Sequence, residues 1–584
     1  ILAPRYKPNF VNFAAASCGF KGIFPAKTGG SARYYGNFHI YHVLLSVLLY
    51  TFLMFIARSI YCCKKCKNVV KLYCYFTEVS ALVSYFKDRP MLTCGLTGSA
   101  LCVIGYYSVE FIFFAALLFI GLCFLIIIKR AKPAFAFVCA VLVLICISLI
   151  LTRNVAVKTA KYNGECLNGD FIVTTEPENR GSYFYTVLEA RDVGEAADCA
   201  RIATFSKNAD FKMGDIITAD VEVSAVSDEY KAMDYAEKIY LTGYAESTAL
   251  KQRAGEPVLA AVGKLRNYIT ETLFSNMDYK EAATLNAVVY GDRSYISEEF
   301  YAHIKSAGVS HVMVVSGMHL AIIVSLVTSL CERFIYNGYL KGFVIFITVL
   351  FMAALCGFTK SIVRAGVCYI IYAVGVAIKR DNTPENTLGG AVSLILAVSP
   401  FTVFSISFQL SALSTLGIVA AAMPLNSAVK EAYLKNHGIA AALFSAISVT
   451  VFALIFTLPV TVYFFGYISS VSVITNLLIG EVITVALTVT VIGLVLYAVV
   501  PMIGEGVLAF AGLAAKYINY VIDRFGSLGF AAASFGEGAF PVSLILFFAV
   551  PAVLFACQKR ADMLKLKAMN KKIMREGGKK LLWR

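Results

Sequence analysis

Long apolar segments joined by short polar connectors occupy most of the chain after residue 90. Each has about the length that crosses a bilayer as a helix. Three of them precede residue 152 and nine follow residue 308, so the pattern predicts a polytopic α-helical membrane protein with about twelve spans. The predicted spans are 91–107, 111–128, 135–151, 309–330, 342–358, 362–378, 388–404, 408–423, 439–465, 483–500, 506–522 and 541–557.

A different pattern lies between the third and the fourth predicted span. From residue 152 to residue 250 the hydrophobicity falls, and apolar residues such as Ile217 and Val221 alternate with polar ones. This period of two indicates half-buried strands, and turn residues such as 179–182 separate the runs. Four or five strands in so short a stretch predict a small OB-like β-barrel.

The remaining regions complete the predicted organisation. Ser297 is a suitable helix N-cap, and the two carboxylates that follow it favour the positive end of a helix dipole. Residues 466–480 are apolar but too short to cross, so we expect a re-entrant segment there. The predicted regions are 1–88, a poorly patterned extension with one candidate span at Tyr41–Ala57; 89–151, three spans; 152–250, the OB-like domain; 251–307, an amphipathic helical segment; 308–557, the main transmembrane domain; and 558–584, a basic tail.

The composition agrees with a membrane protein and suggests its orientation. Hydrophobic residues make up 59% of the chain and charged residues only 15%, against about 25% charged in soluble domains. The net charge is +15, and the basic residues gather in connectors such as 129–133 and in the tail. Because basic connectors stay in the cytoplasm, we expect a cytoplasmic tail and an OB-like domain outside the cytoplasm.

The 16 cysteines predict no metal site. Most lie in apolar runs, where cysteine behaves as a small hydrophobic residue, and the group from Cys62 to Cys74 has no second half of ligands. Cys166 and Cys199 are the only pair in the OB-like segment, and a disulfide between them is plausible in an oxidising compartment. No cofactor motif is evident.

Isolated polar residues recur inside the predicted spans. Such groups are costly in hydrocarbon and mark a pathway or a site by default. The stretch 308–330 is the clearest case, because two histidines and several serines interrupt an apolar run. The residues concerned are His311, Ser316, His319, Lys360, Ser361, Arg364, Gln409, Asn476 and Glu481.

Four blocks of sequence resemble the ComEC-type competence proteins, which carry transforming DNA across the inner membrane. The longest, 287–320, contains G-D before a helix and then H-x(4)-S-G-x-H. The others are GFTKSIVRAG at 357–366, FQLS at 408–411, and 458–478 with its proline, glycine and Asn-Leu-Leu. With the acidic OB-like segment, the resemblance covers about residues 89–557. The fourth block departs from the family in having Phe464 and Glu481.

The resemblance implies an inner-membrane channel for uptake of single-stranded DNA during natural transformation. The expected partners are single-stranded DNA, membrane lipids and separate competence proteins: a DNA receptor, a cytoplasmic ATPase and a nuclease; a homo-oligomer is compatible with the resemblance. Many family members have a metallo-β-lactamase-like domain, but no H-x-H-x-D-H string occurs in this chain. We therefore expect no intrinsic catalysis and no bound metal.

The polar residues suit a DNA channel, but each also has a structural interpretation. Arg364 offers a guanidinium fork for phosphate, or an ion pair with Glu481 that fixes helix packing. Lys360 and Ser361 lie at the mouth of their span, where snorkelling explains the lysine nearly as well. Among the others, hydrogen bonds between helices are the alternative to pore lining; we expect packing for His311 and lining for Ser316, His319, Gln409 and Asn476.

The charge of the OB-like segment leaves open whether it binds DNA. Residues 158–250 hold 9 basic and 17 acidic residues, a net of −8, which repels DNA unless Arg180, Arg191, Arg201 and Lys207 share one face.

Two other functions are alternatives to the DNA channel. An intramembrane hydrolase with Ser316 as nucleophile and His319 as base is a second hypothesis. A transporter of another polyanion or of a small solute is a third, although no internal repeat is evident.

Overall fold

The computed structural model describes residues 90–107, 133–535 apart from short gaps, and a few residues between 541 and 564. The gaps are 180–182, 194–200, 208–209, 228–230, 254, 378–382 and 435–436. The predicted extension 1–88, the predicted span 111–128 and most of the last span and the basic tail therefore lie outside the described residues. So does Cys199, and with it the predicted disulfide.

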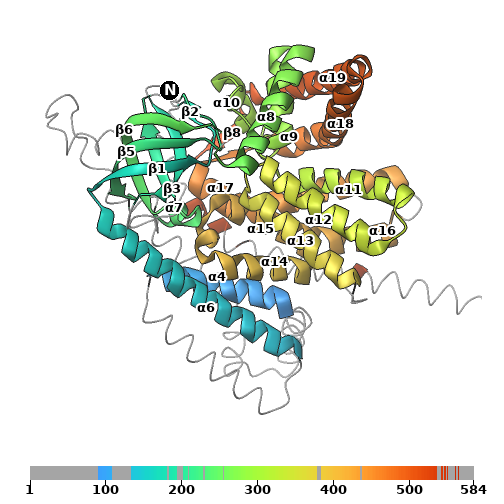
Figure 1. Ribbon diagram of the computed structural model, residues 1–584. Coiled ribbons are helices and arrows are strands. Elements are labelled where there is room, and N and C mark those ends of the chain that lie inside the picture. The colour runs from blue at the N-terminus through green and yellow to red at the C-terminus, as the bar shows by residue number, and fades with distance from the viewer. Residues whose placement is uncertain are drawn as a thin grey trace, which may run out of the picture.

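Six strands of the region after the first helices form one sheet (Figure 1). They are β1 (Cys166–Val173), β2 (Glu178–Asn179), β3 (Phe184–Asp192), β4 (Ile202–Ser206), β5 (Ile216–Ala225) and β6 (Leu241–Gln252). The order β1-β5-β6-β4-β3 closes because β3 also pairs with β1. All these pairs are antiparallel except β4 with β6, which is parallel. The prediction of a small five-stranded barrel is confirmed.

The alternating sequence accounts for the barrel. Buried and half-buried residues alternate along β5, and its inward residues Ile217, Val221 and Val223 join Phe171 and Leu241 in one fully enclosed core. Because successive side chains of a strand point to opposite faces, the same pattern leaves the polar residues between them outside. The barrel core is therefore formed by every second residue of the strand, as the alternating sequence predicts.

Three helices follow the barrel, and the last of them begins at the cap that the sequence predicts. They are α8 (Pro257–Asn276), α9 (Tyr279–Tyr290) and α10 (Glu298–Ser306). The Ser297 hydroxyl accepts a hydrogen bond from the Phe300 N–H at the start of α10. Gly308 has a φ of +74° and follows the end of that helix, a conformation that glycine adopts without strain.

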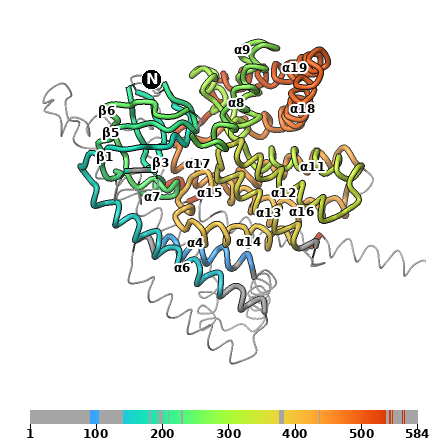
Figure 2. Tube along the Cα trace, viewed as in Figure 1, coloured from blue at the N-terminus to red at the C-terminus, as the bar shows by residue number. Residues whose placement is uncertain are grey.

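Longer helices form the rest of the described chain (Figure 2). Before the barrel lie α4 (Pro90–Tyr107), α6 (Pro133–Thr159) and the 3₁₀ turn η2 (Ala160–Tyr162); α7 (Lys231–Ala236) lies between two barrel strands. After α10 come α11 (Gly317–Phe334), α12 (Gly338–Leu355), α13 (Lys360–Ala377), α14 (Pro384–Val398), η4 (Pro400–Phe404), α15 (Ile406–Gly417), the π-helical turn η5 (Ile418–Ala422), α16 (Met423–Ala432), α17 (Gly438–Phe465), β7 (Tyr467–Ser469), α18 (Ser472–Val499), α19 (Pro501–Gly526) and β8 (Ala532–Ser534).

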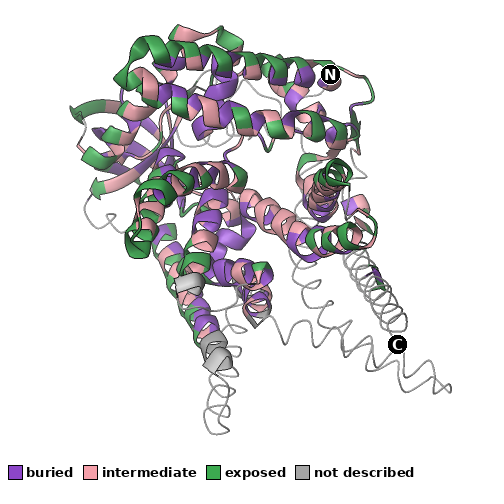
Figure 3. Ribbon diagram, turned by 90° about the vertical axis from the view of Figure 1, so that its right-hand side faces the viewer, coloured by how far each residue is buried: buried purple, intermediate pink, exposed green. Residues whose placement is uncertain are grey.

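Six helices of the described chain are long and apolar enough to cross a membrane. These cover 140–162, 317–334, 338–355, 406–432, 438–465 and 472–499. The mainly helical membrane class is thus supported, whereas a total of twelve spans stays a prediction. Large apolar side chains such as Phe343, Leu350 and Phe351 are exposed on α12, and Figure 3 shows exposed residues along the outer faces of the helices. Helices that expose so much apolar surface fit a lipid environment.

The re-entrant segment predicted at 466–480 is wrong. Gly466 ends α17 in a left-handed conformation, β7 pairs with β8, and α18 then runs without interruption from Ser472 through Gly480 to Val499. The prediction divided this helix at Gly480 and Glu481, but an isolated glycine costs a helix only about 1 kcal/mol. Tertiary packing along a long apolar helix outweighs that cost.

The barrel contacts the helical region through α7. The Tyr235 ring on α7 packs against Phe401 of η4, with ring centroids 5.8 Å apart. An ion pair of 3.5 Å also joins Glu237, just after α7, to Lys360 at the start of α13. The barrel is therefore held next to the helices that carry the second and third sequence blocks.

Candidate functional site

Three helices bring the first three sequence blocks together around Arg364. This arginine lies on α13 and is only 5% exposed. Its Nε and Nη2 atoms both donate to the Ser411 hydroxyl on α15, at 3.0 and 2.7 Å. Hydrogen bonds that involve an ionised group are stronger than neutral ones. The Cys368 side chain, one turn further along α13, is also a hydrogen-bond partner of Arg364. The guanidinium is thus anchored by a hydroxyl of the FQLS block and by a thiol of its own helix.

The N-terminus of α11 approaches the same guanidinium. A Cβ added to Gly317, the first residue of α11, would lie 3.3 Å from the Ala365 Cβ and 3.7 Å from Arg364 Nη2. The glycine therefore permits close contact between α11 and α13. Because the N-terminus of a helix carries partial positive charge, it adds to the positive potential of the arginine.

Ser316 and His319 form a reciprocal cap on α11. The Ser316 hydroxyl accepts from the Met318 N–H, and His319 Nδ1 accepts from the Ser316 N–H at 3.1 Å. The Ser316 hydroxyl also lies 2.9 Å from Nδ1. Since Nδ1 accepts a backbone hydrogen bond, the neutral ring carries its proton on Nε2. His319 is fully buried, and its Nε2 has no hydrogen-bond partner within the described structure.

His311 lies near enough to His319 for the two rings to interact electrostatically. The residue is exposed, although protein atoms surround its ring. A packing role for His311 stays a prediction.

Two further predicted residues border the arginine. The Ser361 hydroxyl, one turn before Arg364 on α13, lies 3.3 Å from the Ser407 hydroxyl. Gln409 is buried, and its Nε2 donates to the Val403 carbonyl at 2.9 Å. Gln409 therefore fixes the end of η4 against α15, which is a structural contact, while its Oε1 has no partner within the described structure.

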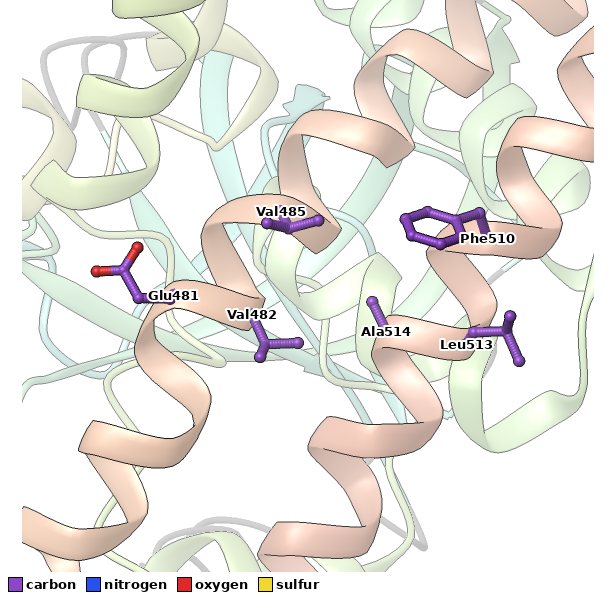
Figure 4. Close-up of a pocket in the computed structure, with 6 residues that line it drawn as sticks. All are labelled: Glu481, Val482, Val485, Phe510, Leu513 and Ala514. Carbon is purple, nitrogen blue, oxygen red and sulfur yellow. The ribbon is translucent and has the colours of Figure 1, made fainter.

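Lys360, Asn476 and Glu481 do not join this group. Lys360 reaches the barrel through Glu237, and Asn476 is half-buried on α18. Glu481 is exposed at one end of an apolar groove of about 330 Å³ between α18 and α19. In Figure 4 its carboxylate points away from α19, whereas Val482 and Ala514 lie within the groove. No ion pair joins Glu481 to Arg364 in the described structure.

Two arginines of the basic face that was considered for the OB-like domain are paired with glutamates. Arg191 lies 3.5 Å from Glu256, and Arg201 lies 3.7 Å from Glu189. Arg180 is outside the described residues, and Lys207 is exposed after β4. Cys166 is an exposed thiol on β1.

The charge balance defines what this site can do. Within the described chain no carboxylate lies within ion-pair distance of Arg364. An uncompensated buried charge is costly, and here a guanidinium, a helix N-terminus and hydroxyls all favour negative charge at one place. The arrangement can bind an anion that carries several oxygens, such as a phosphate.

The sequence reasoning missed Ser407 and Ser411 as site residues, although it quoted the FQLS block. Both hydroxyls lie on α15 at positions i and i+4, and their partners Ser361 and Arg364 lie on α13 at i and i+3. Residues with these spacings share one face of a helix. Two polar stripes in neighbouring apolar helices were therefore the available signal.

Comparison with known proteins places this site in a class. Residues 288–560 match the family of competence proteins, and the described helices from α10 to α19 lie within the matching region. The chain is also similar to ComE operon protein 3 of Bacillus subtilis (strain 168), with 22% identity over 483 residues. The resemblance found in the sequence is confirmed. The aligned region covers 80% of this chain and 59% of that relative, and no solved structure matches the chain.

Proposed function

We propose that this protein is a membrane channel subunit for uptake of single-stranded DNA, without a catalytic step of its own. The observation that carries the proposal is the buried guanidinium of Arg364, which donates to the Ser411 hydroxyl, lies next to the positive N-terminus of α11 and is paired with no described carboxylate. The competence protein domain supports a role in DNA uptake. We place the protein in the inner membrane with the OB-like domain outside the cytoplasm.

A strand of DNA supplies the negatively charged oxygens that this site lacks. Each phosphate offers oxygens that fit the guanidinium fork and a negative charge that a helix N-terminus stabilises. His319 Nε2–H is a further buried donor without a partner in the described structure. A neutral donor and one fixed cation favour transient contacts, since many strong charges in a row would hold a polyanion rather than pass it.

Strand transfer into proteoliposomes tests the proposal. The full chain is reconstituted in vesicles that enclose a complementary quencher strand, and a fluorescent single strand is added outside. We expect R364Q to lower the rate of strand entry by about 10- to 100-fold, because a hydrogen bond to a charged group contributes about 1.5–3 kcal/mol. R364K, which keeps the charge but loses the fork, should give an intermediate rate.

Two variants separate a role in passage from a role in packing. S411A removes the anchor of Arg364 but keeps its charge, and R333Q removes an exposed arginine at the far end of α11. R333Q should transfer DNA as the wild type does. If R364Q and S411A lower the melting temperature equally and leave strand entry unchanged, Arg364 is a packing residue and the proposal fails. Entry of polyphosphate at the DNA rate would instead indicate a general polyanion transporter.

A hydrolase is the second candidate, because Ser316 Oγ lies 2.9 Å from His319 Nδ1. A nucleophile and base at this distance need a third group that orients the base, and the described structure offers none at Nε2. The helix cap explains the same contact. Labelling of Ser316 by a fluorophosphonate probe, abolished in H319Q, would favour the hydrolase. We expect no labelling, and a loss of about 1 kcal/mol of stability in S316A.

A further inference from the structure

Two cations converge on one tyrosine ring at the start of the competence domain. Lys305 Nζ lies 4.3 Å from the centroid of the Tyr301 ring, and Arg293 Cζ lies 5.9 Å from it. Arg293 Nη1 also donates to the Tyr301 hydroxyl at 3.3 Å. Both cations are attracted by the electrons of the ring, so Tyr301 holds them close together despite their mutual repulsion.

No described acid neutralises this pair of cations. Neither Arg293 nor Lys305 forms an ion pair within the described structure. The neighbouring Asp292 accepts hydrogen bonds from Ser294 and Tyr290 instead. Burial, and after it the nearby Arg293 charge, lowers the pKa of Lys305. Two like charges that are held together without a counter-charge favour an anion between them.

A series of neighbouring polar side chains lies between the cation pair and the start of α11. Tyr467 of β7 lies beside both Tyr301 and Ser310, the residue before His311. The Ser469 hydroxyl donates to the Ser306 carbonyl at 2.7 Å, which holds β7 against the end of α10. The neighbours Tyr301, Tyr467, Ser310, His311 and His319 thus connect the cation pair to the cap of α11.

We propose that Arg293 and Lys305, positioned by Tyr301, bind one backbone phosphate of a single-stranded nucleic acid at the C-terminal end of α10. The inference rests on the proposed function, because it names the place where the transported strand is first held. Arg293 is exposed and Lys305 half-buried, so a flexible strand can reach both. The exposed aromatic ring of Tyr295, two residues after Arg293, offers a base a stacking surface.

A phosphate could also belong to a lipid headgroup, and the position of the pair favours the strand. Arg293 lies in the connector between α9 and α10, and Lys305 lies in the last turn of α10, a helix whose exposed charged residues are Glu298 and Glu299. A lipid-binding cation pair would be expected beside an apolar helix face that lies in the bilayer. Here the neighbouring side chains are those of Tyr301, Tyr467 and Ser310.

Salt-dependent binding tests this inference. The full chain is placed in nanodiscs of phosphatidylcholine, and its affinity for fluorescent oligo-dT is measured by anisotropy from low to high salt. For single strands, log K changes with log salt by about −0.7 for each neutralised phosphate. We expect R293Q/K305Q to weaken binding about tenfold and to reduce the slope by about 0.7. Each single variant should have a smaller effect, and K305R should restore most of the affinity.

Two further variants make the expectation specific. K264Q removes an exposed lysine of α8, so it has the same charge change as each single variant but should leave the slope unaltered. Y301L keeps both cations and removes the ring that positions them, so it should weaken binding without any change in net charge. Circular dichroism melts of each variant confirm that the fold is retained.

The outcomes are distinguishable from those of the Arg364 experiment. If wild type and R293Q/K305Q bind oligo-dT with the same affinity and slope, this inference is wrong even where R364Q blocks strand entry. If the double variant binds oligo-dT as the wild type does and loses only its affinity for phosphatidylglycerol headgroups, the pair binds lipid and the inference is again wrong. Tight binding by the wild type without strand entry would contradict the proposed function and leave the binding site supported.

Discussion

Replacing Asp234 with asparagine should make the contact between the barrel and the helices less sensitive to pH. Asp234 lies on α7, beside Tyr235, whose ring packs on Phe401. Burial, together with the neighbouring Glu237 charge, raises the pKa of Asp234 from 3.8 to about 6. The carboxyl group therefore binds its proton more tightly in the folded protein than in the unfolded chain.

The sign and size of the effect follow from this pKa. A raised carboxyl pKa contributes stability that is fully present below about pH 4 and is lost as the pH rises through about 6. The difference between a pKa of 3.8 in the unfolded chain and about 6 in the folded protein corresponds to about 3 kcal/mol of stability. Because asparagine does not titrate, the stability of D234N relative to the wild type should increase by about that amount between pH 4 and pH 7.5.

Hydrogen exchange of residues 231–240, measured by mass spectrometry on the full chain in nanodiscs, reports the free energy of opening of this segment. D210N, at an exposed carboxylate of the same domain, is the matched change away from α7. If the free energy of opening differs between D234N and the wild type by the same amount at every pH, the reasoning is refuted. An equal pH-dependent gain in D210N would show that net charge, and not burial, is responsible.

Two further variants test single contacts. G308A should destabilise the protein by more than about 1 kcal/mol, because Gly308 has a φ of +74° and a Cβ there would lie 2.5 Å from the Ser472 Cβ. Thermal melts measure the loss, and G438A is the control because a Cβ at that position meets open space. K360Q and E237Q should show a coupling energy below about 1 kcal/mol in a double-mutant cycle, since Glu237 is half exposed. A larger coupling would mean that this ion pair holds the barrel in place.

The barrel and the presence of long helices could be predicted because both depend on local patterns. Alternation along β5 gives a strand with one buried face, and its length fits a small barrel. The cap at Ser297 also follows from neighbouring residues alone. In contrast, Gly480 interrupts no helix, because packing of α18 along its whole length overrides a weak local preference.

The site itself was predicted only in part, because it depends on which helices are neighbours. Arg364, Ser316 and His319 were singled out as polar groups in apolar segments, yet the suggested ion pair with Glu481 is absent from the described structure. Ser411 anchors the arginine instead. No single-chain pattern states that α13 packs on α15 rather than on α18, so the partner of a buried charge is the least predictable feature.

The energetics of Arg364 lead to a last prediction. Transfer of a charge to the interior costs several kcal/mol unless it is well compensated, and the bonds to one Ser411 hydroxyl contribute about 1.5–3 kcal/mol. Burial of the guanidinium therefore lowers the stability of the fold. If Arg364 served only to pack the helices, methionine would fill similar space without this loss of stability.

We expect R364M/S411A to melt at a temperature equal to or above that of the wild type and to lose strand entry. The gain in stability should be about 1–4 kcal/mol if the pair behaves as buried ionic groups replaced by apolar ones do. Differential scanning fluorimetry with a thiol-reactive dye and the proteoliposome assay measure the two properties on the same preparation. A marked fall in melting temperature would mean that the guanidinium stabilises the helix contacts, and that passage of DNA does not explain its presence.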